Sequence, residues 1–156
     1  MDRKWLLITI LIISMFIAGC NRIDTDSQTT TVGKLILDQD RLMTIKVIRG
    51  SSEQKSIEIS DSDYIRKLLD EVKAIPVKRL SKDEDVDFMQ LRIQDEAMIS
   101  IFFYEYDSLK GGLVIWPDGY VYAVDSGSME GNQRTVSYLS ESKYPEVYEL
   151  VGGEEE

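Results

Sequence analysis

The chain has 156 residues, a formal net charge of −10 and no histidine. This length leaves room for one domain. The absence of imidazole excludes Ser-His-Asp and Cys-His catalysis and HExxH zinc sites, and the negative charge disfavours nucleic acid as a partner.

The first nineteen residues have the pattern of an export signal. Arg3 and Lys4 precede an almost unbroken apolar run from Trp5 to Ala18. A membrane-spanning helix needs about 20 apolar residues, so this run is short for a span. It fits the basic and apolar regions of a signal peptide, which we expect to cover residues 1–19 and to be removed. An uncleaved anchor and an ordinary cleaved signal are the alternatives.

The segment Ile17-Ala18-Gly19-Cys20 resembles a bacterial lipobox. In proteins with this motif, a diacylglyceryl group is attached to the cysteine, a signal peptidase cleaves just before it, and acyl chains such as palmitate anchor the product. The resemblance implies lipid attachment at Cys20 and cleavage recognition by Ile17, Ala18 and Gly19. Cys20 is the only cysteine, so no intrachain disulfide can form. Two acyl chains anchor a protein stably, whereas one holds it marginally. We therefore expect a lipid-anchored protein on the extracytoplasmic side of the cell membrane.

The remaining chain divides into three expected parts. Residues 20–33 are polar, rich in Ser and Thr, and predicted to form the lipidated tether. Residues 34–152 are expected to form a small acidic domain, followed by a solvated acidic tail at 153–156. Removal of residues 1–19 takes away one net positive charge and leaves −11. Such a domain is repelled by anionic lipid headgroups and favours a basic partner.

Alternating apolar residues predict a series of strands. The turn 50–53 predicts a hairpin between the first two strands, and Pro117-Asp118-Gly119 predicts another. The predicted strands cover residues 43–47, 57–59, 89–93, 99–103, 113–116, 120–124 and 135–139.

Two helices are predicted. Ser60 and Asp63 have the spacing of a capping box, and apolar residues from Ile65 to Val72 recur with helical period until Pro76. A short second helix is expected from Pro145 to Val151. Consecutive strands joined by short turns must be antiparallel. The sequence therefore predicts an α+β fold, with one antiparallel sheet of about six or seven strands against one main helix and a short C-terminal helix.

A second resemblance rests on the block Ile59 to Ile65, the dipeptide Ile75-Pro76 and the segment Val86 to Met89. Together with a C-terminal turn like Tyr144 to Val151, this order is similar to the YhfM-like small lipoproteins of Gram-positive bacteria. The resemblance implies a non-enzymatic envelope lipoprotein and assigns no catalytic residue.

Two residue patterns partly match the motifs of known catalytic or metal sites. Ser52/Lys55 and Ser140/Lys143 match S-x-x-K, but the partner motifs of Ser-Lys hydrolases are missing. Asp83, Asp85 and Asp87 have the first EF-hand spacings. Phe88 and Gln94 stand where that loop needs glycine and glutamate, so we expect a solvated acidic loop, with weak calcium binding as the alternative. No metal and no cofactor is predicted.

Aromatic residues supply the candidate binding face. In a strand, Tyr120 and Tyr122 share one face and Val121 the other. If the main helix covers the Val121 face, then Trp116, Tyr120 and Tyr122 form an exposed strip suited to a protein or glycan. The alternative is that these rings complete the core. The irregular segment 125–134 is expected to be a recognition loop or a plain connector.

These features favour a non-catalytic cell-envelope lipoprotein that binds or modulates another envelope component, most simply an envelope protein. An inhibitor or immunity-type protein that captures a basic toxin or lytic enzyme is the first alternative. A wall-polymer hydrolase using a carboxylate pair is the second.

Overall fold

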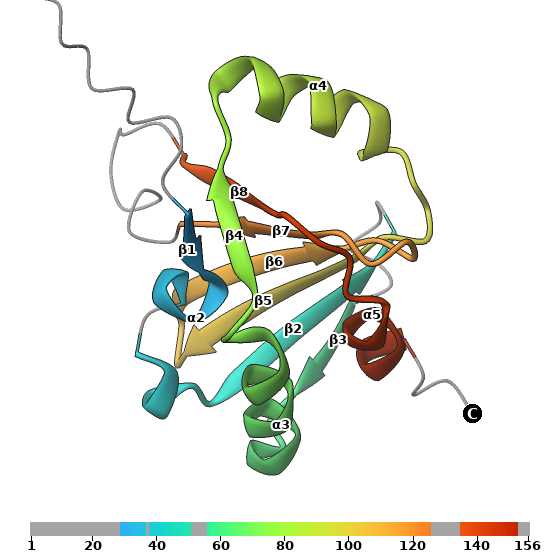
Figure 1. The fold of residues 1–156 in the computed structure, drawn as a ribbon. Coiled ribbons are helices and arrows are strands. Elements are labelled where there is room, and N and C mark those ends of the chain that lie inside the picture. Colours follow the sequence, from blue (N-terminus) through green and yellow to red (C-terminus); the bar gives the residue numbers. More distant parts are fainter. Residues whose placement is uncertain (1–28, 37, 51–55, 126–134, 153–156) are drawn as a thin grey trace, which may run out of the picture.

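The computed structural model describes residues 29–36, 38–50, 56–125 and 135–152. These residues form an α+β domain in which one antiparallel sheet of eight strands packs against helices (Figure 1). The predicted fold class and single antiparallel sheet are confirmed. The sheet has more strands than expected, and the described residues contain four α-helices instead of two.

The strand order across the sheet is β1-β4-β8-β7-β6-β5-β2-β3. In this order the strands are β1 (Thr29–Thr31), β4 (Pro76–Arg79), β8 (Ser137–Ser140), β7 (Val121–Val124), β6 (Ser108–Ile115), β5 (Ile99–Glu105), β2 (Thr44–Arg49) and β3 (Ser56–Ile59). The sequence did not predict β1 and β4, because β1 consists of three threonines and β4 has one valine between proline and lysine, so neither shows an alternating apolar pattern. Pro76 begins β4, a position where a strand tolerates proline.

The two predicted hairpins are present. β2 pairs with β3 so that Ile45 lies opposite Ile59, and β6 pairs with β7 across the turn at 116–120. Gly119 in that turn has φ +86, and an added Cβ would lie 2.7 Å from the backbone nitrogen of Pro145. Its carbonyl accepts a hydrogen bond from the backbone N–H of Tyr144 at 2.7 Å. The turn is thereby fixed against the start of the C-terminal helix.

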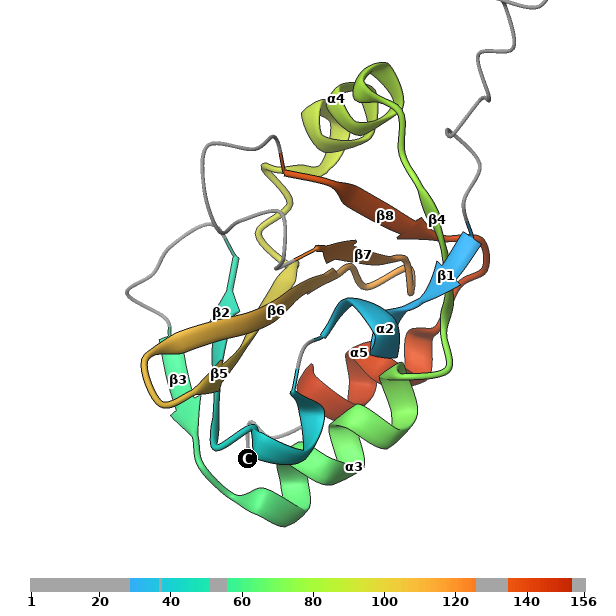
Figure 2. The ribbon, with the colours of Figure 1, turned by 90° about the vertical axis from the view of Figure 1, so that its left-hand side faces the viewer.

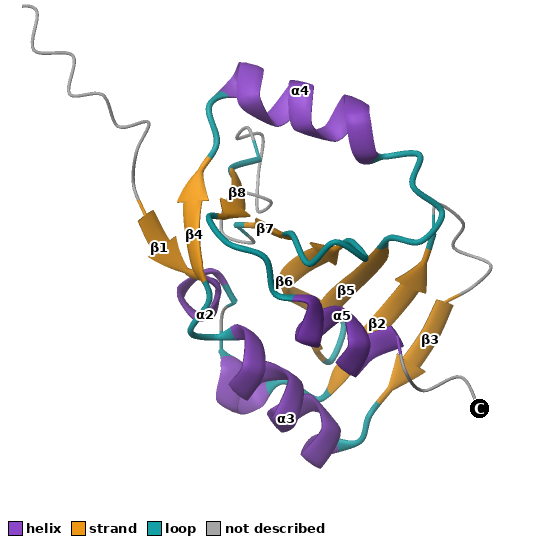
Figure 3. Ribbon diagram, turned by 45° about the vertical axis from the view of Figure 1, so that its right-hand side comes forward, coloured by secondary structure: helices purple, strands orange, loops and turns teal. Residues whose placement is uncertain are grey.

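Three helices cover one face of the sheet: α2 (Val32–Leu35), α3 (Ser62–Val72) and α5 (Pro145–Gly152) (Figures 2 and 3). Strand residues Ile101, Phe103 and Leu113 are at most 1 % exposed beneath them. The predicted apolar stripe of α3 is buried in this core. Its N-cap is Asp61 instead of the expected Ser60, and the Asp61 carboxylate accepts hydrogen bonds from two backbone N–H groups at 2.9 Å.

The predicted tether is shorter than expected. Thr29 to Thr31 pair with β4, and Val32 is fully buried in the core. Its backbone N–H donates to the carbonyl of Ile75 at 3.0 Å. The folded domain therefore begins at or before Thr29, not at residue 34. Residues 20–28 and 153–156 lie outside the described part of the chain.

The largest correction concerns residues 82–92. They form a helix, α4 (Lys82–Arg92), in place of the predicted acidic loop at 83–87 and strand at 89–93. Ser81 begins it with a complete capping box, since its hydroxyl accepts from the Glu84 N–H at 3.3 Å and the Glu84 carboxylate accepts from the Ser81 N–H at 2.8 Å. Leu91 and Ile93, whose alternation with polar residues predicted a strand, face solvent and are 86 % and 51 % exposed.

Candidate functional site on helix α4

Helix α4 lies over the face of the sheet that α2, α3 and α5 leave uncovered. Along β7, Val121 and Ala123 face the core, so Tyr122 faces the other way. Tyr122 is the residue of β7 that α4 contacts. The helix stands apart from the other helices (Figures 1 and 3). None of its residues is fully buried, so a few side chains must attach it to the sheet.

The centre of the attachment is an aromatic cluster. The ring of Phe88 meets Trp116 edge-on with centroids 5.2 Å apart, and it stacks parallel to Tyr122 at 6.2 Å. Trp116 is 0 % and Tyr122 7 % exposed, and Tyr120 is half-buried. These three rings therefore do not form an exposed strip: helix α4, which the sequence did not predict, covers Trp116 and Tyr122, as in the alternative that the rings are buried, and Tyr120 is half-buried.

The C-terminal end of α4 is held by an ion pair. Two nitrogens of the Arg92 guanidinium donate to the two carboxylate oxygens of Asp118, at 2.9 and 2.8 Å. The same guanidinium lies 5.1 Å from the Phe88 ring and 5.0 Å from the Tyr120 ring. Hydrogen bonds from Arg92 lower the pKa of Asp118 to about 2 and raise the pKa of Arg92. Arg92 and Asp118 are therefore both charged at neutral pH and form a two-point ion pair.

The N-terminal half of α4 is held by a polar cluster. The Tyr122 hydroxyl donates to the Asp85 carboxylate at 2.8 Å and lies 2.7 Å from the Ser137 hydroxyl. Burial and the neighbouring Asp85 carboxylate raise the pKa of Tyr122 to about 12. The phenol is therefore neutral at physiological pH and cannot act there as a general base.

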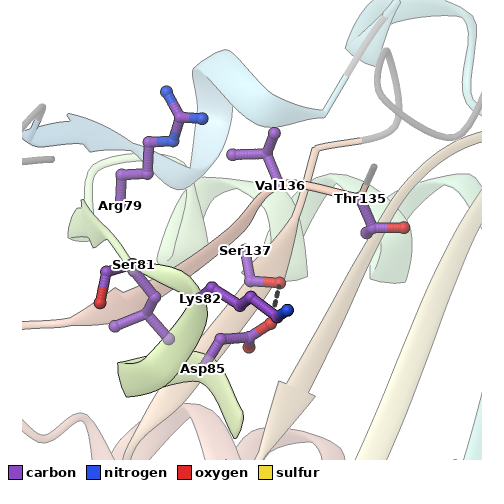
Figure 4. Close-up of a pocket in the computed structure, with 8 residues that line it drawn as sticks. Arg79, Ser81, Lys82, Asp85, Thr135, Val136 and Ser137 are labelled. Atoms are coloured by element: carbon purple, nitrogen blue, oxygen red, sulfur yellow. Dashed lines mark hydrogen bonds between the residues drawn. The ribbon is translucent and has the colours of Figure 1, made fainter. Parts of the chain in front are cut away.

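A small cavity opens beside this polar cluster (Figure 4). It measures about 130 Å³ and is lined by Arg79, Leu80, Ser81, Lys82, Asp85, Thr135, Val136 and Ser137. Ser137 and Asp85 face each other in it, with their side-chain oxygens 3.4 Å apart. Small-molecule sites usually measure about 300–1,000 Å³. This cavity has room for a few water molecules only.

The outward side of α4 carries exposed apolar and acidic side chains. Val86 is 44 % and Leu91 86 % exposed, and Ile93 follows just after the helix. Asp83 and Asp87 are exposed on the same helix. Exposed apolar groups that gather on one element, unlike scattered ones, mark interaction surfaces. This surface is the strongest candidate site in the described part of the chain.

The structure does not assemble Ser140 and Lys143, the S-x-x-K pair within the described residues, into a site. Ser140 is buried, and its hydroxyl accepts from the backbone N–H of Val121 at 3.0 Å. Lys143 is exposed and lies 3.5 Å from the Asp118 carboxylate. Ser52 and Lys55 lie outside the described residues, as do the lipobox residues Ile17 to Cys20 and the loop segment 126–134.

The acidic EF-hand-like spacing does not form a calcium loop, because Asp83, Asp85 and Asp87 are on a helix that turns them in different directions. In the described ranges, no three carboxylate, cysteine or histidine groups converge as metal ligands. The attachment residues Phe88, Arg92 and Asp118 were not singled out from the sequence. The signal that could have found them is the capping box Ser81-Lys82-Asp83-Glu84, which predicts a helix start and places Phe88 and Arg92 one turn apart.

No helix among residues 29–36, 38–50, 56–125 and 135–152 is both long and apolar enough to cross a membrane. A scan against protein-family models finds no matching family, and searches of curated proteins and of solved structures find no match. The resemblances to a lipobox and to the YhfM-like lipoproteins therefore stay predictions from the sequence.

Proposed function

We propose that this chain is a non-catalytic lipoprotein of the cell envelope, anchored by lipid on Cys20, whose extracytoplasmic domain binds or modulates another envelope protein. The lipobox-like segment Ile17 to Cys20 supports the location. The observation that carries the binding role is helix α4, which has no fully buried residue and exposes large apolar side chains. A helix that contributes so little to the core has a better explanation as a contact element than as a structural one.

The inhibitor or immunity-type alternative is a special case of the same proposal. A negatively charged domain on a lipid anchor suits the capture of a basic toxin or lytic enzyme, because electrostatic attraction speeds encounter. Binding that weakens steeply with salt and abolishes the activity of the bound enzyme would favour this alternative. A wall-polymer hydrolase would instead show turnover that one carboxylate substitution removes.

The experiment has two parts, both with full-length protein in a bacterial host. Chemical crosslinking in cells, followed by mass spectrometry, should recover one dominant envelope protein. Cell fractionation should place wild-type protein in the membrane fraction and release a Cys20→Ala variant from it, while mass spectrometry of the wild type should find the lipid on Cys20. Recovery of nothing above background would contradict the binding role, whereas an unmodified Cys20 in membrane-bound wild type would contradict the anchor.

A further inference from the structure

The side chains of α4 divide sharply between its two sides. Asp85, Phe88 and Arg92 are spaced by three and four residues, so they share the side that faces the sheet. Asp83 and Asp87, one turn apart, are exposed to solvent on another side, and Val86 and Leu91 flank them. The helix is thus attached by one side and presents a mixed acidic and apolar surface on the other.

The basic residue at the end of α4 does not neutralise this surface. Arg92 turns inward, where Asp118 and the aromatic rings hold its guanidinium. Asp95 and Glu96 follow directly after the helix and are exposed. From Lys82 to Glu96, the outward charges are therefore mainly negative, with Lys82 at the start of the helix as the exposed cation of this stretch.

A hollow next to this surface combines apolar walls with carboxylates, as a basic side chain requires. It measures about 450 Å³ and is lined by Leu91, Arg92, Asp95, Pro117 and Asp118. Leu91 and Pro117 give it apolar walls, and both are exposed. The Asp95 carboxylate, which accepts one backbone hydrogen bond from Ala97 at 3.0 Å, keeps acceptor capacity for a further donor. A lysine or arginine side chain suits such a hollow, because its aliphatic stem packs on apolar walls while its charge meets a carboxylate.

We propose that the outward surface of α4, formed by Asp83, Val86, Asp87, Leu91 and Asp95, is the docking surface for a basic protein outside the membrane. Lysine or arginine side chains of that partner meet Asp83 and Asp87, its apolar side chains pack on Val86 and Leu91 at either flank, and one basic side chain enters the hollow beside Leu91. The inference rests on the proposed binding function and adds the surface and the partner's chemistry. Charge complementarity selects this occupant, since a second copy of the acidic chain and an anionic lipid surface would both be repelled.

The test is site-specific photocrosslinking in cells with full-length protein. A photoreactive phenylalanine analogue replaces Leu91 in one strain and Tyr106 in another. Tyr106 is the matched control because it is 76 % exposed and lies in the β5–β6 turn. The register of these strands places that turn at the opposite end of the sheet from Trp116.

We expect a discrete protein adduct from position 91 and none from position 106, with the crosslinked peptide of the partner containing lysine or arginine. Substituting three surface carboxylates of the site (Asp83→Asn, Asp87→Asn, Asp95→Asn) should lower the adduct yield about fivefold. The charge-matched control on α3 (Asp63→Asn, Asp70→Asn, Glu71→Gln) should leave the yield unchanged. Fluorescence of Trp116 verifies that both variants are folded.

Three results would overturn the inference. An adduct from position 106 alone would leave the binding function standing and show that the surface is wrong. An adduct from position 91 that is unchanged in the site variant, or that contains lipid or glycan without peptide, would refute the basic protein partner. No adduct from either position, together with no envelope protein recovered by general crosslinking, would refute the binding function as well.

Discussion

Arg92 and Asp118 form a two-point ion pair between the end of α4 and the β6–β7 turn. Exposed ion pairs contribute little to stability, but fork-to-fork geometry and aromatic neighbours make this one stronger than most. Asp118 retains 35 % and Arg92 26 % side-chain exposure. Solvent screening therefore reduces the effect of the lowered pKa, and we expect the pair to contribute about 1 kcal/mol.

Asp118→Asn should lower the free energy of unfolding by about 1 kcal/mol at pH 7. The pKa of Asp118 is about 2 in the folded protein and 3.8 ordinarily. Its stabilising contribution is thus complete above pH 4 and is lost as pH falls from 3.8 through 2. Urea unfolding at several pH values should show wild type and variant converging over this interval. Asp87→Asn, on the exposed side of α4, is the control, and an equal loss there would contradict a specific ion pair.

Tyr122→Phe should lower the free energy of unfolding by about 1 kcal/mol, because Asp85 and Ser137 lose a shared hydrogen-bond partner. The pKa of Tyr122 is raised from 10 to about 12, so its neutral form is favoured in the folded state. The stability it contributes is present below pH 10 and is lost as pH rises from 10 through 12. Denaturant unfolding should show that the variant is less sensitive to this pH range than wild type. Tyr106→Phe, in an exposed turn, should behave like wild type.

At the scale of elements, α4 is the least buried α-helix in the described part of the chain. Phe88, Arg92 and Asp85 fix it at three points along its length, and none of the eleven residues is fully buried. We therefore expect α4 to detach from the sheet before the sheet itself unfolds. Trp5 lies in the predicted signal peptide, so Trp116 is the only tryptophan in residues 20–156 and monitors this step directly.

Phe88→Ala should uncover Trp116 while the rest of the domain stays folded. The expected result is a red shift of tryptophan emission with little change in the circular dichroism of the sheet. The free energy of unfolding should fall by about 2 kcal/mol, less than the 3–5 typical of a fully buried phenylalanine, because Phe88 is only half-buried. Leu91→Ala, on the outward side, should leave the emission unchanged. Unaltered emission in Phe88→Ala would mean that α4 does not depend on this ring.

The elements that could be predicted are those with long, consistent patterns. The α3 stripe from Ile65 to Val72 and the β6–β7 hairpin around Gly119 both follow from local sequence. Helix α4 could not be assigned from apolar pattern, since Leu91 at its end and Ile93 just after it face solvent and imitate an alternating strand. The cap at Ser81 carried the correct signal there. The contact surface proposed for α4 would break the usual rule of apolar burial, as functional sites do.

At the scale of the whole molecule, the core lies between one face of the sheet and the three helices α2, α3 and α5. The sheet also begins nearer the N-terminus than the sequence predicted. β1 pairs with β4, and Val32 is fully buried. Both features depend on contacts more than forty residues apart in the chain, which no local pattern reveals. The candidate binding face was misplaced for the same reason: Trp116, Tyr120 and Tyr122 do lie together, but the sequence does not show what covers them.

A fragment that begins at residue 34 should be less stable than one that begins at residue 29, both ending at residue 152. The shorter fragment lacks β1 and Val32, and the loss of one buried valine with a strand pairing corresponds to about 2–3 kcal/mol. Thermal unfolding of the two fragments measures this difference. Extending the longer fragment to residue 156 is the control and should change little. Equal stability of the two fragments would contradict the position of the domain boundary.

The most direct test of the proposed function is the intact mass of the chain purified from bacterial membranes, with sequencing of its N-terminal peptide. A lipid-anchored lipoprotein should begin at Cys20 and carry a diacylglyceryl group on the cysteine sulfur. This result would place the α4 surface outside the cytoplasm and close to the membrane, where an envelope partner can reach it. A chain that keeps residues 1–19, or that has an unmodified Cys20, would contradict the anchor and with it the proposed envelope role.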